Sequence, residues 1–219
     1  MVGIIGVLFS IMTTPAGVGG PSSLLFFTLQ SNIWIIFIMI LFGINDCVLL
    51  KKGRGFLNEK WFRVKFVFTV SLTLTFLVFG LLLFPAIPLD YSLSVTSLTL
   101  HLIAPIIAIA DFAAFDHGRP LERTDIVMAL LPPLYYVLFV VACNLIGLRF
   151  PPDGNVAPYF FMDYETYGWL AITSSGIGVV YWGLFLFLAV MMIAFSLRAF
   201  AIIIQRKMTA KTTRKPKNC

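Results

Sequence analysis

Five long apolar runs constrain the fold of this chain more than any other feature of the sequence. They cover residues 24–50, 66–84, 95–115, 126–148 and 171–197. Each is close to the ~20 apolar residues that a helix needs to cross a bilayer core ~30 Å thick. Charged residues make up only 12% of the chain and apolar residues 59%, whereas a soluble domain carries roughly a quarter charged residues. The sequence therefore predicts an all-α polytopic membrane protein and excludes a soluble enzyme and a disordered chain.

A sixth apolar segment, residues 2–12, is too short to cross a bilayer by itself. Continued through Thr13, Thr14 and Pro15, it would reach ~21 Å as a helix. A secretory signal peptide would begin with basic residues, and no Lys or Arg precedes Lys51. We therefore expect a short or truncated first helix and a six-helix bundle. The expected organisation is one transmembrane domain over residues 1–205 and a basic cytoplasmic tail at 206–219.

The 16 basic residues predict the orientation of the helices. All except Arg149 fall within residues 51–65, 119–123 and 198–217, which six helices would place on one side of the membrane. By the positive-inside rule that side is the cytoplasm, so both termini are expected there. The expected location is the cell membrane. Basic clusters between apolar runs do not form a nucleic-acid-binding face, so no nucleic-acid partner is expected.

Two polar side chains lie at similar depths inside the predicted helices. His101 is about six residues, or ~9 Å, below the outer end of the fourth helix, with no charged residue near it in sequence. Thr28 is ~6 Å below the outer end of the second helix, on one face with Ser31 and Asn32. A hydroxyl beside an imidazole in a dry site is the minimum for nucleophilic acyl chemistry. The alternatives are a threonine bonded to its own helix and a neutral histidine bonded to a carbonyl on another helix.

The same polar groups are open to other functions. A proton-linked carrier or lipid-binding protein could use His101, Asp111 and Asp46 as relay groups. A bis-histidine haem is disfavoured because His117 falls in a cytoplasmic loop. No lysine lies between residues 65 and 207 to hold a retinal, and neither H-E-x-x-H nor G-x-S-x-G occurs. No metal or organic cofactor is expected.

The longest predicted outer loop, residues 149–170, is rich in aromatic side chains. They are Phe150, Tyr159, Phe160, Phe161, Tyr164, Tyr167 and Trp169. Such rings are typical of an interfacial aromatic belt, and they would also suit a lid over a lipid-facing site.

Four short motifs occur in order along most of the chain. They are FFTLQSN at 26–32, HLIAPIIAIADF at 101–112, PPLY at 132–135 and PYFFMD at 158–163. In order and spacing they resemble the androgen-induced membrane hydrolase family, and in particular its prokaryotic branch. The resemblance implies a six-helix intramembrane hydrolase. The characterised animal members cleave fatty acid esters of hydroxy fatty acids with a threonine nucleophile and a histidine.

The resemblance assigns catalytic roles to the two residues that the depth argument pairs. The threonine of the motif falls on Thr28 and the histidine on His101. The expected function is therefore hydrolysis of a lipid or fatty acyl ester. A long acyl ester needs a mostly apolar tunnel. We expect this tunnel between the second and fourth helices, with Met39, Ala104 and Ala108 on its walls.

The group that orients the histidine is left open by the sequence. Asp111 is ~15 Å along the helix from His101 and is too far away. Asp90 or Asp163 could fold in from the outer loops. Asn32, one turn from Thr28, could donate to an oxyanion in the substrate site or could bond between helices.

Overall fold

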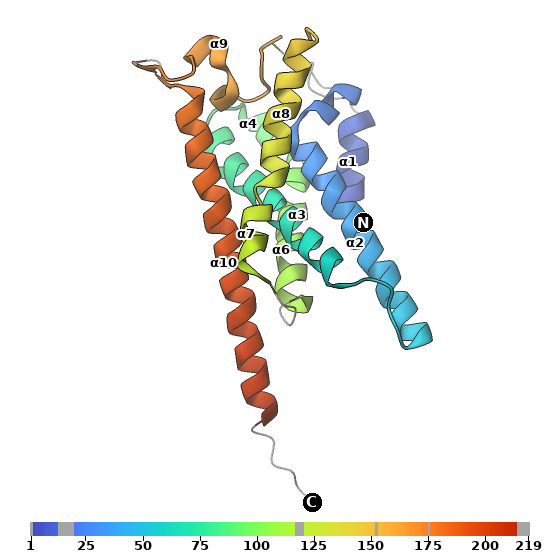
Figure 1. The fold of residues 1–219 in the computed structure, drawn as a ribbon. Helices are drawn as coiled ribbons and strands as arrows, with labels where there is room; N and C mark the ends of the chain where they lie inside the picture. The colour runs from blue at the N-terminus through green and yellow to red at the C-terminus, as the bar shows by residue number, and fades with distance from the viewer. Residues whose placement is uncertain (1, 13–19, 117–120, 152, 175, 214–219) are drawn as a thin grey trace, which may run out of the picture.

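The computed structural model describes residues 2–12, 20–116, 121–151, 153–174 and 176–213, and most of these residues are helical (Figure 1). The helical elements are α1 (Val2–Met12), η1 (Gly20–Leu25), α2 (Phe27–Lys52), α3 (Glu59–Val78), η2 (Phe79–Leu83), α4 (Leu89–Ser92), α5 (Val95–Leu98), η3 (Thr99–Ile103), α6 (Ala104–Phe115), α7 (Arg123–Met128), α8 (Leu131–Leu145), η4 (Phe160–Met162), α9 (Tyr164–Tyr167) and α10 (Val179–Thr213). Of the η elements, η1 and η4 are 3-10 turns, whereas η2 and η3 are π-helical turns. Strands β1 (Ile172–Thr173) and β2 (Gly176–Ile177) form a short antiparallel hairpin.

Five helical segments are long and apolar enough to cross a membrane. They are Phe27–Lys52, Glu59–Leu83, Val95–Phe115, Arg123–Leu145 and Val179–Arg206. The chain is therefore a helical membrane protein, as the five apolar runs predict. Helix α1 has 11 residues and is about 16 Å long. Within the described residues, a sixth helix of full membrane length is not found.

Two helices begin well away from the residues at which the sequence predicts them. Helix α3 begins at Glu59 rather than near residue 66, because the side chain of Asn58 caps it by accepting the N–H of Lys60 at 3.1 Å. Helix α10 begins at Val179 rather than near residue 171, because Ile172 and Thr173 pair with Ile177 and Gly176 in the hairpin. At its other end α10 continues to Thr213, so the expected tail begins as helix.

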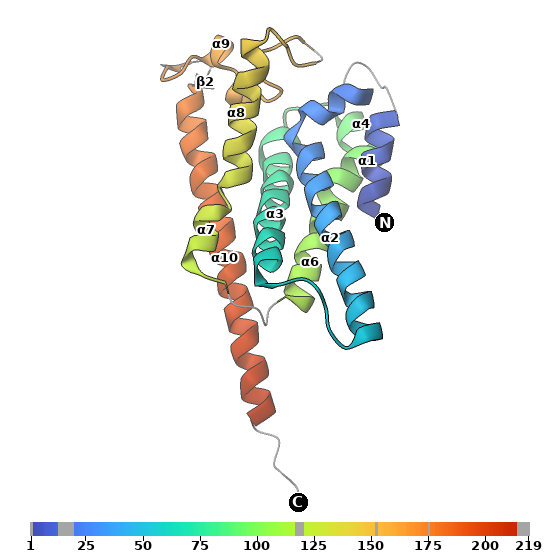
Figure 2. The ribbon, with the colours of Figure 1, turned by 45° about the vertical axis from the view of Figure 1, so that its right-hand side comes forward.

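Helix α3 lies at the centre of the bundle. It contacts α2, α6, α7, α8 and α10, and Figure 2 shows it between α2 and α10. Its buried hydroxyls each donate to the backbone carbonyl four residues earlier. These hydroxyls belong to Thr69, Ser71, Thr73 and Thr75. Polar side chains can therefore sit in the apolar core without water, because their hydrogen bonds are satisfied within the helix.

The two ends of the bundle differ in character. The lower end in Figure 1, called the basic end below, includes the C-terminal turn of α2 with Lys51 and Lys52 and the far end of α10. The upper end includes η1, α4, α9 and the hairpin. Most of the described basic residues thus lie at one end, in line with their clustering in the sequence.

A buried ion cluster ties α3 to α6 near the basic end. Lys65 is 4% exposed, and its Nζ lies 2.5 Å from Oδ2 of Asp111 and 2.5 Å from Oδ2 of Asp116. The ammonium also lies over the ring of Phe42. Asp111 is therefore held by a lysine near the basic end, and Asp46 is exposed near the end of α2. Neither aspartate is bonded to His101.

Candidate active site

The side chains of Thr28 and His101 meet inside the upper half of the bundle. Thr28 Oγ1 lies 3.2 Å from His101 Nε2, and both residues are buried. The other ring nitrogen, Nδ1, lies 2.9 Å from the backbone carbonyl of Ser97. Because a carbonyl oxygen only accepts, Nδ1 carries the ring proton. Nε2 therefore accepts the Thr28 hydroxyl proton, which is the arrangement that a general base needs.

Thr28 lies in the first turn of its helix rather than a full turn inside it. Turn η1 extends to Leu25, and α2 begins at Phe27 after Phe26, which supplies no side-chain cap. The first N–H groups of a helix have no partner within that helix, and they carry the positive end of its dipole. The N–H of Thr28 donates instead to the phenol oxygen of Tyr159 at 3.4 Å. The threonine hydroxyl is thus presented beside the positive end of a helix dipole.

The π-turn η3 and Pro105 explain how α2 is joined to the histidine. In this turn the N–H of Ala104 bonds to the carbonyl of Thr99, five residues earlier. The next residue is a proline and has no N–H, so the carbonyl of Leu100 lacks the corresponding partner. Asn32 Nδ2 donates to that carbonyl at 3.1 Å and to the carbonyl of Thr28 at 2.8 Å. One amide therefore ties the turn that carries Thr28 to the turn that carries His101.

The same two bonds decide between the roles considered for Asn32. A side-chain amide has two N–H donors, and both of Asn32's are directed at backbone carbonyls. The residue is fully buried. Asn32 therefore bonds between helices and keeps no donor for an oxyanion.

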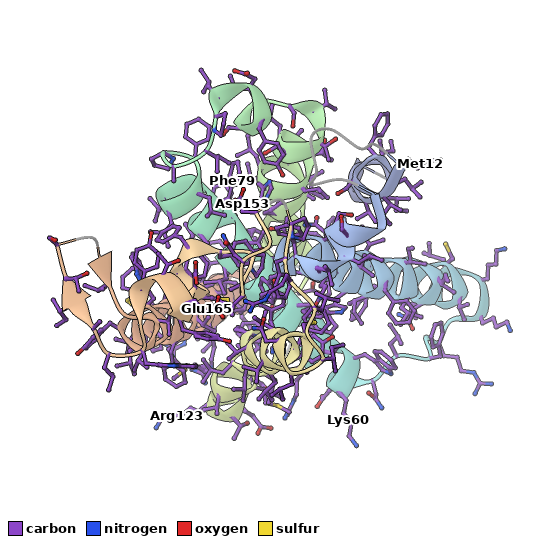
Figure 3. The ribbon with its side chains drawn as sticks, turned by 90° about the horizontal axis from the view of Figure 1, so that it is seen from above. Met12, Lys60, Phe79, Arg123, Asp153 and Glu165 are labelled. Atoms are coloured by element: carbon purple, nitrogen blue, oxygen red, sulfur yellow. The ribbon has the colours of Figure 1, made fainter. Side chains whose placement is uncertain are left out.

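A phenylalanine fixes the plane of the imidazole. Phe79, in the second π-turn η2, stacks on His101 with ring centroids 3.9 Å apart and an interplanar angle of 15°. Figure 3 looks down on the upper end and shows Phe79 among the central side chains, whereas Lys60 and Arg123 lie at the periphery. Stacking on one face and hydrogen bonds at both nitrogens leave the ring a single orientation.

Neither of the two carboxylates considered as the group that orients His101 bonds to it. Asp163 caps α9 by accepting the N–H of Thr166 at 3.2 Å and its hydroxyl at 2.7 Å. Asp90 is exposed in α4. In their place the carbonyl of Ser97 accepts the Nδ1 proton. That carbonyl fixes the tautomer as a triad acid would, without adding a charge.

A cavity of about 580 Å³ opens on the other side of Thr28. Its walls come from α2, α3, η2, α7, α8, α10 and the aromatic segment 159–169, and they are almost entirely apolar. The polar groups that reach it near the pair include Thr28, Thr75 and Tyr159. Its volume falls in the range of small-molecule sites, which are mostly apolar with a few placed polar groups.

The predicted wall residues Met39, Ala104 and Ala108 do not line this cavity. Ala108 packs with Ile35 and Leu72 in a separate cluster, with Met39 against it, and Ala104 is buried at the start of α6. The expected tunnel between the second and fourth helices is therefore misplaced, because these side chains fill that interface. The open space lies instead between α3, α8 and α10.

The aromatic loop that the sequence predicts on the outer side folds over the upper end of the cavity. Tyr159, Phe161, Met162 and Tyr164 line it, together with Trp169, whose ring stacks on Tyr164. Figures 1 and 2 show this segment above α10 and beside the upper end of α8. A position over the cavity matches the lid alternative, while the exposure of Trp169 is also typical of an interfacial ring.

Comparison of the chain with protein-family models, with curated proteins and with solved structures gives no match in any of the three.

The sequence alone does not single out three residues of the site: Ser97, Phe79 and Tyr159. Ser97 contacts His101 Nδ1 through its carbonyl at 2.9 Å and through its hydroxyl at 3.3 Å, and its position four residues before the histidine is the only sign of this in the sequence. Phe79 is one of 22 phenylalanines. Tyr159 has a signal, because it lies in the PYFFMD motif, but nothing in the sequence places it next to a threonine 131 residues earlier.

Proposed function

We propose that this protein is an intramembrane hydrolase that cleaves a lipid ester, with Thr28 as nucleophile and His101 as general base and acid. The observation that carries the proposal is the buried contact of 3.2 Å between Thr28 Oγ1 and His101 Nε2, beside an apolar cavity that Thr28 itself lines. The resemblance of four motifs to the androgen-induced membrane hydrolase family supports the same assignment.

The proposed reaction has two balanced halves. Thr28 Oγ1 attacks the ester carbonyl carbon as its proton moves to His101 Nε2, and the carbonyl π electrons move to oxygen. When the tetrahedral intermediate collapses, the bond to the alcohol oxygen breaks and the alcohol takes the proton from Nε2. Water then attacks the acyl-threonine and gives a proton to Nε2. Collapse of this second intermediate releases the fatty acid and returns the proton to Thr28.

The apolar cavity favours a long acyl chain as the group bound next to the carbonyl. Leu74, Val78, Val140, Leu186 and Val190 give it walls without a charged side chain. Such walls bind hydrocarbon by removing it from water and provide little that would hold a polar substrate. We therefore assign the acyl part of a lipid ester to this space, with a fatty acid ester of a hydroxy fatty acid as the substrate that the resemblance implies.

The proposed orientation places the basic end in the cytoplasm. The excess of Lys and Arg at that end supports this by the positive-inside rule. Helix α1 would then act as a short sixth membrane segment, both termini would be cytoplasmic, and the Thr28–His101 pair would lie in the outer half of the cell membrane.

The carrier alternative has less support from the geometry. A proton relay would need His101 and Asp111 to communicate. Asp111 bonds to Lys65 near the basic end, ten positions or ~15 Å along the helix from His101. Both ring nitrogens of His101 bond to Ser97 and Thr28 instead.

Labelling with a lipophilic fluorophosphonate, followed by mapping of the modified residue, tests the proposed nucleophile. In the purified protein the probe should lose fluoride and attach to Oγ1 of Thr28. His101→Ala should greatly slow the labelling, since the base is lost. Ser23, a buried hydroxyl residue in η1, provides the control: Ser23→Ala should be labelled as fast as the wild type. Labelling of folded Thr28→Ala protein at the wild-type rate would overturn the proposal.

A further inference from the structure

The site as described lacks a donor for the negative charge that ester cleavage creates on oxygen. Preorganised donors to such an oxyanion are often the largest single contribution to acyl-transfer catalysis. Asn32 is the nearest amide on α2, but its two N–H groups are used on the carbonyls of Thr28 and Leu100. A donor must therefore come from another group that touches both Thr28 and the cavity.

The phenol of Tyr159 meets both conditions. Its oxygen accepts the backbone N–H of Thr28 at 3.4 Å, and Tyr159 and Thr28 both line the cavity. The acceptor role uses a lone pair of the phenol and leaves its O–H proton available to donate. A carbonyl placed in the cavity for attack by Thr28 Oγ1 would lie next to this hydroxyl.

The surroundings of Tyr159 keep the phenol protonated and its ring in place. Burial raises the pKa of Tyr159, although hydrogen bonds from Thr28 oppose the increase. The phenol thus remains a donor at neutral pH. The ring stacks on Phe161 with centroids 5.2 Å apart and meets Phe26 edge-on at 6.2 Å. These contacts fix the hydroxyl before a substrate arrives, as preorganised stabilisation requires.

We propose that Tyr159 is a further catalytic residue whose phenol O–H donates to the carbonyl oxygen of the ester and stabilises the oxyanion of the tetrahedral intermediate. This inference rests on the proposed hydrolase function. The N–H of Thr28 continues to donate to the phenol oxygen, which strengthens the phenol as a donor because linked hydrogen bonds polarise one another. The positive end of the α2 dipole lies at the same point and favours the developing negative charge.

Tyr159→Phe isolates the hydroxyl, since the phenyl ring keeps the aromatic packing. With a long-chain fatty acid ester of a hydroxy fatty acid as substrate, kcat should fall about 10²–10³-fold, the usual cost of losing one oxyanion donor, while KM changes little. Tyr181→Phe is the matched control. Its hydroxyl bonds to the carbonyl of Leu170, outside the site, and kcat should match that of the wild type.

Two non-hydrolysable lipids separate catalysis from packing. A phosphonate analogue has charged oxygens like those of the intermediate and should bind Tyr159→Phe more weakly than the wild type. An ether analogue has no carbonyl oxygen and should bind both proteins equally. Equal weakening for both analogues would show that Tyr159 only shapes the cavity, and would overturn the proposal.

The failures of the two proposals are distinguishable. Ester cleavage by wild-type protein together with an unchanged kcat in Tyr159→Phe overturns the role of Tyr159 and leaves the hydrolase intact. No cleavage and no labelling of Thr28 in folded wild-type protein overturns both.

Discussion

A histidine ring buried in a helix bundle must find partners for two nitrogens in a region without water. In this chain one nitrogen of His101 donates to a backbone carbonyl of its own helix and the other faces a threonine on a different helix. The protonated nitrogen is thus fixed by local backbone, and the basic nitrogen is directed at a hydroxyl. At the scale of single residues, these two hydrogen bonds couple Thr28 to His101, so the two side chains should act together.

The first prediction is that the two residues lose activity together. Thr28→Ala and His101→Ala should each remove nearly all ester cleavage, and the double variant should be little worse than either, because nucleophile and base act as a unit. Thr28→Ser keeps a hydroxyl and should retain part of the activity. Steady-state kinetics on the four variants would check this. Independent, multiplicative losses would contradict the coupling.

The second prediction concerns the amide that joins the two helices. Asn32→Leu removes the donor to the carbonyls of Leu100 and Thr28. Folding should suffer little, since an interhelical hydrogen bond in a membrane averages about 0.6 kcal/mol. Activity should fall more, up to about 10²-fold, because a displacement of the reacting groups by about 1 Å can cost that much.

Gln30→Leu is the control for Asn32→Leu. It removes a comparable bond, from Gln30 to the carbonyl of Leu24, on the same helix and outside the pair. Paired measurements of kcat and melting temperature should show an activity loss only in Asn32→Leu. Equal losses of activity in the two variants would show that Asn32 does not position the reacting groups.

At the scale of elements, the site depends on two π-turns and on a close helix contact. Turn η3 carries His101, and η2 carries the phenylalanine stacked on it. Helix α1 packs against η3. Its Gly6 approaches so closely that an added Cβ would lie 2.6 Å from Thr99 Cγ2 and 3.1 Å from Leu100 Cδ2. Although α1 is too short to span a bilayer core, it supports the turn that holds the histidine.

The third prediction follows from that close approach. Gly6→Leu cannot fit without moving η3, so ester cleavage should fall at least about tenfold through displacement of His101. Gly43→Leu is the matched control, because a Cβ at Gly43 meets no atom within 4 Å. Its activity should equal that of the wild type. If Gly6→Leu protein turns over substrate normally, α1 does not position the site.

At the scale of the whole molecule, the apolar cavity and the ion cluster lie in different parts of the bundle. The cavity lies among α3, α8 and α10 under the outer loop, while the buried ion cluster of Lys65, Asp111 and Asp116 lies near the basic end. The apolar walls allow a hydrocarbon chain to lie inside the bundle, and the ions hold α3 and α6 together below it. Substitutions in the cavity and substitutions in the ion cluster should therefore have separate effects.

The fourth prediction concerns the length of the acyl chain. Gly183 lines the cavity, and an added Cβ there meets no atom within 4 Å. Gly183→Leu should therefore place its side chain in the cavity without strain and shift the preference toward shorter acyl chains. The measurement is kcat/KM for a series of esters that differ in acyl length, with Gly43→Leu as control. An unchanged length profile would mean that the acyl chain binds elsewhere.

The fifth prediction concerns the ion cluster. Lys65→Met removes the ammonium that pairs with the half-buried Asp111 and the buried Asp116, and it should destabilise the protein by about 3–5 kcal/mol. Adding Asp111→Asn and Asp116→Asn to the same protein should restore much of the stability. Thermal unfolding in detergent would test both, with Lys60→Met at an exposed position as control. A melting temperature unaffected by Lys65→Met would show that the cluster contributes nothing to folding.

Two properties of the sequence predict parts of the structure: the long apolar runs predict the helices, and the positions of polar residues within those runs predict which of them meet. The five long helices follow from hydropathy. The depth argument pairs Thr28 with His101, which do meet, but it places Thr28 too deep, because α2 begins only at Phe27. The start of α2 at Phe27 does not follow from hydropathy, because the residues before it are apolar too and form a 3-10 turn. In the π-turn η3 the backbone hydrogen bonds shift by one residue relative to an α-helix. Pro105 is the main feature of the sequence that indicates such an irregularity. The cavity depends on how side chains fill the space between helices, which hydropathy does not report.

The contact between Thr28 and Tyr159 also has a consequence for the time at which activity appears during synthesis. The two residues are 131 positions apart, and a ribosome adds about 5–20 residues per second, so the threonine is made on the order of ten seconds before the phenol. Thr28 and His101 are made before the loop that carries Tyr159 and before α10, which forms one wall of the cavity. Under the proposed mechanism a nascent chain that lacks Tyr159 and α10 therefore cleaves the lipids around it far more slowly than a chain in which α10 has been inserted.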